Sequence, residues 1–133
     1  MQDFRNLDVW KKAHDLALDV HRTLNALKRI DVSLRTQAAR AAQSIPTSVA
    51  EGCGKDTRAE LARFSDIAIG SSTELEYHLL LGRDLGQIPR KDYDRLSAST
   101  VEVRRMLFGL RRAIREGKKA RNPANPAVAS TTG

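Results

Sequence analysis

Residues 10–27, WKKAHDLALDVHRTLNAL, indicate the fold because their apolar side chains recur at alternating steps of three and four. These side chains are Trp10, Ala13, Ala17, Val20, Leu24 and Leu27. Such steps place all of them on one face of an α-helix. The pattern predicts an amphipathic helix over residues 8–27, with Asn6 or Asp8 as its N-cap.

A second helix is predicted over residues 34–52, where apolar side chains again recur at helical spacing. Asp31 or Ser33 can cap its start, and Gly52 is typical of a helix end. Pro46 lies inside this helix. It lacks an amide hydrogen and crowds the preceding turn, which predicts a kink or a local overwinding.

The third helix, over residues 57–85, has the clearest start signal. Thr57 is followed three residues later by Glu60, the pattern of a capping box in which each side chain accepts a backbone amide of the other residue. A fourth helix is predicted over residues 89–117, because side chains recur there at helical spacing after Pro89, which is tolerated in a first helical turn. This seam comprises Tyr93, Leu96, Thr100, Val103, Leu107, Leu110 and Ile114.

Four amphipathic helices with short connections predict an all-α protein, an antiparallel up-down four-helix bundle formed by residues 1–117. Residues 118–133 begin with two lysines and continue with proline, alanine, serine and threonine, so we expect a disordered tail there. Small side chains between Ala68 and Ser72 allow another backbone to come close, either within the bundle or from another subunit.

The chain of 133 residues is long enough for one domain with its own core. No apolar stretch approaches the roughly 20 residues that a membrane span needs, and the N-terminus lacks the apolar region of a secretory signal. The single cysteine, Cys53, cannot form an internal disulfide. We therefore expect a cytoplasmic protein with no membrane association.

The net charge of +7 is concentrated in one segment. Residues 104–121 contain eight basic side chains and one acid, Glu116, whereas the rest of the chain is balanced. Seven residues make nearly two helical turns, so basic residues seven apart form two adjacent columns along the fourth helix. We predict a nucleic-acid-binding stripe made of Arg90, Lys91, Arg104, Arg105, Arg111, Arg112, Arg115, Lys118 and Lys119.

Two interpretations of this stripe remain open. A solvated helix face normally interleaves acids, and this stripe does not, so a polyanion such as RNA or DNA would relieve its self-repulsion. With aromatic residues at 5%, base stacking is expected to contribute little. Alternatively, the stripe docks an acidic surface of a partner protein.

No other residues form a convincing chemical site. His14 and His21 share a helix face without further ligands, so no metal is expected. Lys55 can lower the pKa of Cys53, but no base lies near this thiol in the sequence. Glu51 lacks a second carboxylate for acid–base work and is expected to pair with an arginine across the bundle or a subunit boundary. We predict a protein with no catalytic residues and no cofactor.

Two segments resemble a known family. Residues 37–54, QAARAAQSIPTSVAEGCG, and residues 60–79, ELARFSDIAIGSSTELEYHL, are similar to the proteins first described from open reading frames in intervening sequences of bacterial 23S ribosomal RNA. The structural signature of this resemblance is Ser44, Ile45, Pro46, Glu51, Gly52, Gly54, Arg63, Phe64, Gly70, Ser71 and Glu74. Ser48 departs from the pattern, since many relatives have asparagine there.

The resemblance implies a four-helix bundle that assembles into a ring, expected to be a homopentamer with a central channel. Its best-understood members are the accessory variability determinant proteins of diversity-generating retroelements, which are basic and bind nucleic acid and a reverse transcriptase. For this chain, the resemblance implies a non-enzymatic accessory protein with nucleic acid as a partner and a reverse transcriptase as a second one.

Overall fold

The computed structural model describes residues 2–117, which form four α-helices after a short 3-10 helix, η1 (Phe4–Asn6). The α-helices are α1 (Asp8–Ala26), α2 (Val32–Cys53), α3 (Arg58–Asp84) and α4 (Arg90–Arg115). Each predicted helix is present, with its bounds displaced by two residues or fewer. The predicted tail, residues 118–133, lies outside the described residues.

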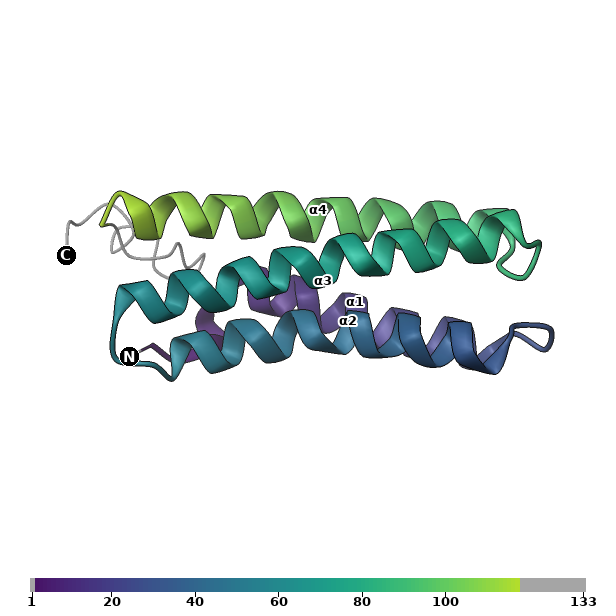
Figure 1. Ribbon diagram of the computed structural model, residues 1–133, viewed down its shortest axis with the longest axis horizontal. Coiled ribbons are helices and arrows are strands. Elements are labelled where there is room, and N and C mark those ends of the chain that lie inside the picture. The colour runs from purple at the N-terminus through teal and green to yellow at the C-terminus, as the bar shows by residue number, and fades with distance from the viewer. Residues whose placement is uncertain (1, 118–133) are drawn as a thin grey trace.

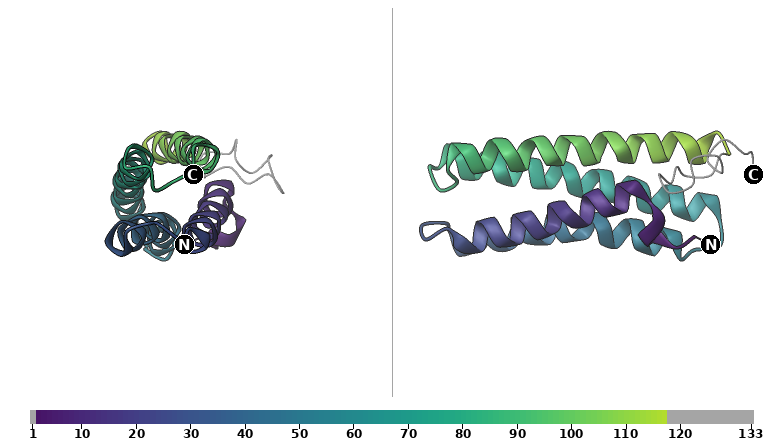
Figure 2. Two further views of the ribbon diagram at one scale, coloured as in Figure 1. Left: turned by 90° about the vertical axis from the view of Figure 1, so that its right-hand side faces the viewer. Right: turned by 180° about the vertical axis from the view of Figure 1, so that it is seen from behind.

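The four helices run alternately up and down and occupy the corners of a square (Figures 1 and 2). Each packs on the helices before and after it in the chain, and α1 closes the square against α4. The α2–α3 contact is the most extensive and the α1–α4 contact the least. The all-α four-helix bundle is therefore confirmed. No helix within residues 2–117 combines the length and the apolarity that crossing a membrane requires.

Side-chain caps explain where two helices begin. Asp31 accepts the amide of Ser33 at 2.7 Å and caps α2, and Thr57 accepts the amide of Glu60 at 3.1 Å and caps α3. Only this half of the predicted capping box is present, because the Glu60 carboxylate pairs with Arg63 instead. The predicted cap of α1 is wrong: Leu7 occupies the N-cap position and makes no side-chain bond.

Small residues let α2 and α3 approach closely. Ser44 Oγ and Ser71 Oγ lie 2.8 Å apart across the contact, and Ala68 and Ser72 are fully buried. A Cβ added at Gly52 would stand 3.0 Å from Phe64 Cβ. Much of the small patch predicted in α3 therefore serves contacts inside the bundle.

Gly52 does not end α2, which corrects the prediction. The helix continues to Cys53 with Gly54 as its C-cap, and neither glycine has a positive φ. α2 also continues through the buried Pro46 without a break, so the bend expected there stays a prediction. At the other end of the bundle, Gly86 has φ +72° and turns the chain after α3.

Candidate nucleic-acid interface

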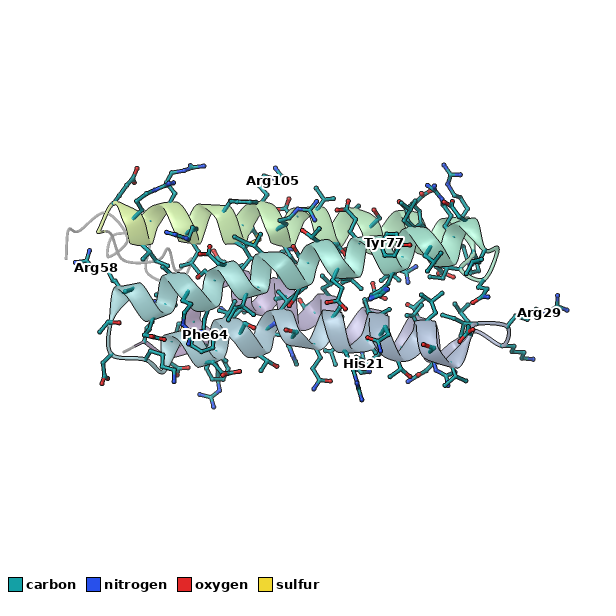
Figure 3. The ribbon with its side chains drawn as sticks, in the orientation of Figure 1. His21, Arg29, Arg58, Phe64, Tyr77 and Arg105 are labelled. Carbon is teal, nitrogen blue, oxygen red and sulfur yellow. The ribbon has the colours of Figure 1, made fainter. Side chains whose placement is uncertain are left out.

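The arginines of α4 form two columns, one with Arg104 and Arg111 and one with Arg105 and Arg112, and the two columns face different surroundings. Arg104 and Arg111 turn toward α3, and 20% and 33% of their side chains are exposed. Arg105 turns away from the bundle with 75% of its side chain exposed, and Arg112 is exposed as well. Figure 3 shows Arg105 on the outer edge of α4. The sequence placed these columns side by side, and the structure separates an inward from an outward one.

The inward column is paired with carboxylates of α3. Arg111 Nε donates to Asp66 Oδ1 at 2.9 Å. Arg104 Nη1 lies 2.8 Å from Glu76 Oε1, although its N–H groups are not directed for a hydrogen bond, so this contact is Coulombic. The expectation that the stripe has no interleaved acids is therefore wrong for this column, because α3 supplies them. These two arginines primarily join α3 to α4.

The outward face of α4, which carries Arg105, Arg112 and Arg115, has fewer carboxylate partners. Arg105 pairs with Glu102 one turn earlier in α4. Arg112 and Arg115 are both exposed, and among residues 2–117 no carboxylate forms an ion pair with either of them. A polyanion can reach these guanidinium groups without first displacing a carboxylate.

The start of α4 contributes less to the stripe than the sequence predicts. Arg90 pairs with Asp94 at 3.3 Å, and Lys91 is exposed next to the acidic Asp92. Asp92 pairs with Arg95, and Lys91 forms no ion pair within residues 2–117, so the start of α4 holds one cation without a carboxylate partner, whereas the opposite end holds two, Arg112 and Arg115. Lys118 and Lys119, the last members of the predicted stripe, lie outside the described residues.

Arg58 joins this basic end of α4 from the start of α3. A Cβ at Gly117 would stand only 2.6 Å from Arg58 Nη1, so the guanidinium group lies directly against the end of α4. Figure 3 shows Arg58 at this end of the bundle. In the sequence, Arg58 belongs to a second group of basic residues around the α2–α3 connection, where acids are interleaved and pairing within the chain would be expected. In that group, which comprises Arg35, Arg40, Lys55, Arg58 and Arg63, only Arg63 forms an ion pair within residues 2–117.

The signature residues lie along α2 and α3. Ile45 is part of the core, Pro46 is buried beside it in α2, and the Arg63 guanidinium lies over the Phe64 ring at 4.5 Å from its centroid. Gly70 is exposed on α3, with nothing within 4 Å of an added Cβ. Neighbouring contacts therefore explain part of the signature and leave Gly70 unexplained within one chain.

The acidic signature residues behave differently from each other. Glu74 pairs with His78 at 3.1 Å, as the spacing of four predicts. Glu51 is exposed and forms no ion pair with any residue from 2 to 117. The arginine partner expected for Glu51 is thus not within the described part of the chain.

Cys53 is enclosed by the bundle. Its side chain is 3% exposed, and burial, with a smaller contribution from Asp3, raises the pKa of the thiol to about 11. The expected lowering of this pKa by Lys55 is therefore wrong. Within residues 2–117, no group of three or more histidine, cysteine or acidic side chains is placed to hold a metal ion.

The histidines of α1 take part in aromatic contacts. The His14 ring stacks on Trp10 with centroids 4.9 Å apart, and Phe4 meets the same Trp10 edge-on at 4.8 Å. His21 lies further along α1 (Figure 3).

The model of the 23S rRNA-intervening sequence proteins matches residues 5–109. The chain belongs to this family. The matched segment ends before Arg111, so Arg112 and Arg115 lie beyond it. Family membership therefore accounts for the helical bundle but does not extend to the basic end of α4.

A solved structure has the same fold. It is a protein of unknown function from the S23 ribosomal protein family of Bacteroides thetaiotaomicron, with a TM-score of 0.71 and 23% sequence identity. The similarity covers 77% of this chain and 97% of the other chain. No curated protein matches the chain.

Proposed function

We propose that this chain is a non-enzymatic, oligomeric accessory protein that binds the phosphate backbone of RNA or DNA through the outward face of α4. The observation that supports this best is the exposure of Arg112 and Arg115 without carboxylate partners among residues 2–117. Arg58 adds a third guanidinium group at the same end of the bundle. The proposed site also includes Arg105, whose guanidinium group leaves Glu102 when it binds a phosphate.

Backbone binding follows from the chemistry of these groups. Guanidinium groups bind phosphate through several parallel N–H donors, and each neutralised phosphate releases counterions, so affinity falls steeply with salt. Such contacts carry little sequence information. The chain would therefore recognise polyanionic nucleic acid as a class rather than one sequence.

Oligomerisation completes the proposal. The resemblance implies a ring of subunits, expected to be a pentamer, which would multiply a weak contact of each chain by avidity. The exposed Gly70 and the 41% exposed Ile67 on α3 support a subunit contact there. The molar mass in solution tests this, and Gly70→Arg should lower that mass while helicity is retained, because arginine is the better helix former.

A salt titration of binding to an RNA hairpin and a DNA duplex tests the main proposal. Two variants each remove two positive charges from α4: R112Q/R115Q from the outward face and R104Q/R111Q from the inward column. We expect the outward variant to bind more weakly, with a slope against log salt shallower by about 1.4–1.8. The inward variant is the matched control and should keep the native slope.

The inward variant should instead lose stability, by up to about 1 kcal/mol for each pair with α3. Equal weakening by both variants would mean that only the net charge matters. Native chain that binds neither nucleic acid at low salt contradicts the proposal.

The second candidate is a scaffold that docks an acidic partner protein, of which a reverse transcriptase is the one expected from the resemblance. Its support is that Arg90, Arg104, Arg105 and Arg111 all take carboxylates as partners in this fold. Binding to an acidic protein that survives salt, without binding to nucleic acid, would favour this candidate.

A further inference from the structure

Phe108 stands on the outer surface of α4 although it is a large aromatic residue. It is 51% exposed, and Val101, one heptad earlier, is 41% exposed. The buried face of α4 is already filled by Leu96, Val103, Leu107, Leu110 and Ile114, among others. The core therefore does not require an aromatic ring at position 108.

Arginines surround Phe108 along the helix. Arg105 precedes it by one turn, Arg112 follows it by one turn, and Arg115 lies one heptad further in the same column as Phe108. With a rise of 1.5 Å per residue, Arg105 and Arg112 are displaced from Phe108 by about 4.5 and about 6 Å along the axis. An exposed ring thus lies between two outward cations.

The surface beside Phe108 is open. Gly109 lies within the C-terminal third of α4, and a Cβ placed there meets nothing within 4 Å. Glycine is the poorest helix former after proline, and no contact within residues 2–117 demands it here. The missing side chain leaves room for a flat group to reach the helix backbone next to the ring.

We propose that this face binds single-stranded nucleic acid, with one base stacked on Phe108 and the adjacent phosphates held by Arg105 and Arg112. Every base has a π-face that can stack on an aromatic side chain, whereas a duplex hides these faces between base pairs. The proposal rests on the proposed function and names its substrate class. It also revises the expectation that stacking contributes little, because composition does not reveal which aromatic side chain is exposed.

Fluorescence anisotropy with a 12-nucleotide single strand and the duplex of the same sequence tests this proposal. Phe108→Ala should weaken single-strand binding about 5- to 100-fold and duplex binding less than about 2-fold. Its salt slope should stay native, because no charge is removed. Gly109→Leu should also weaken single-strand binding while favouring the helix, which separates binding from folding.

Tyr77 provides the matched control. It is 57% exposed on α3 but follows two acidic residues, Glu74 one turn earlier and Glu76 directly before it, which disfavour phosphate. Tyr77→Ala should leave both affinities native. The molar mass of each variant in solution should equal that of the native chain.

Three outcomes overturn the stacking site. Equal loss of single-strand and duplex binding in Phe108→Ala, or no loss of either, removes the base-stacking role and leaves backbone binding intact. Dissociation of a native oligomer by Phe108→Ala assigns the ring to a contact between copies. Absence of nucleic-acid binding by the native chain overturns the proposed function together with this inference.

Discussion

Gly82 lacks a side chain because Ile88 occupies the place where one would stand. A Cβ there would lie 2.4 Å from Ile88 Cδ1 and 2.7 Å from Ile88 Cγ1, and both residues are buried. Gly82→Ala should therefore lower the free energy of unfolding by about 1–3 kcal/mol through overpacking. Gly109→Ala is the control and should raise it by about 1 kcal/mol, because the site is open and alanine is the better helix former. Urea unfolding followed by circular dichroism measures both, and stabilisation by Gly82→Ala would contradict the packing described here.

Cys53 illustrates burial at the same scale. Because burial raises the pKa of the thiol to about 11, its thiolate fraction near pH 8 is about a hundredfold below that of a group at the ordinary value of 9.0. The folded chain should react with a disulfide reagent at least about a hundredfold more slowly than the urea-unfolded chain. Rapid labelling of the folded chain would show that this end of the bundle opens readily.

At the scale of the elements, one bridge holds α1 to α4. Arg95 donates to both carboxylate oxygens of Asp19 at 3.1 Å and to Thr23 Oγ1 at 2.7 Å, and it also reaches Asp92. The hydrogen bond from Arg95 is the largest influence on Asp19 and lowers its pKa, whereas partial burial opposes this shift and Thr23 adds to it. The bridge is part of the contact that closes the square of helices.

The pH dependence of stability should report this bridge. Because the folded pKa of Asp19 lies below the unfolded value, its contribution is complete above about pH 4 and is lost as the pH falls through the folded pKa. The two side chains are 36% and 46% exposed, so we expect about 0.5–1 kcal/mol at low salt. Asp19→Asn should lose this amount at pH 7 and match the native chain near pH 2. Asp94→Asn, which removes an exposed pair within α4, is the control and should change little at either pH.

Periodicity predicts the elements well and their relative rotation poorly. The apolar seams of all four helices follow from spacing within each helix, so each helix could be placed from its own residues. The partners of Arg104 and Arg111 could not, because Glu76 and Asp66 face them only once α3 is set in register and rotation against α4. The position of Arg58 beside the end of α4 could not be predicted for the same reason. Gly52 was assigned to a helix end, since a local pattern does not show that Phe64 packs against it.

At the scale of the whole molecule, the core of the described residues lies well inside the range 2–117. Its buried members extend from Leu7 to Ile114. A chain that stops at Gly117 should therefore unfold within about 0.5 kcal/mol of the full chain, because no buried contact of residues 2–117 is removed. Its affinity for nucleic acid should fall, since Lys118, Lys119 and Arg121 are lost with the tail. Loss of cooperative unfolding in the shortened chain would contradict a single domain within residues 1–117.

The contact between α1 and α4, which closes the square of helices, is the least extensive contact between neighbouring helices. α1 has 19 residues, against 22, 27 and 26 for the other three helices, and it meets α4 across a surface hollow of about 330 Å³ lined in part by Lys12, Asp15 and Ser99. Figure 2 shows these two helices side by side at the closing edge. Local opening begins where the fewest buried contacts must separate. Amide hydrogens of α1 should thus exchange with solvent before those of α2 and α3. The edge between α1 and α4 is therefore the place where the bundle first opens.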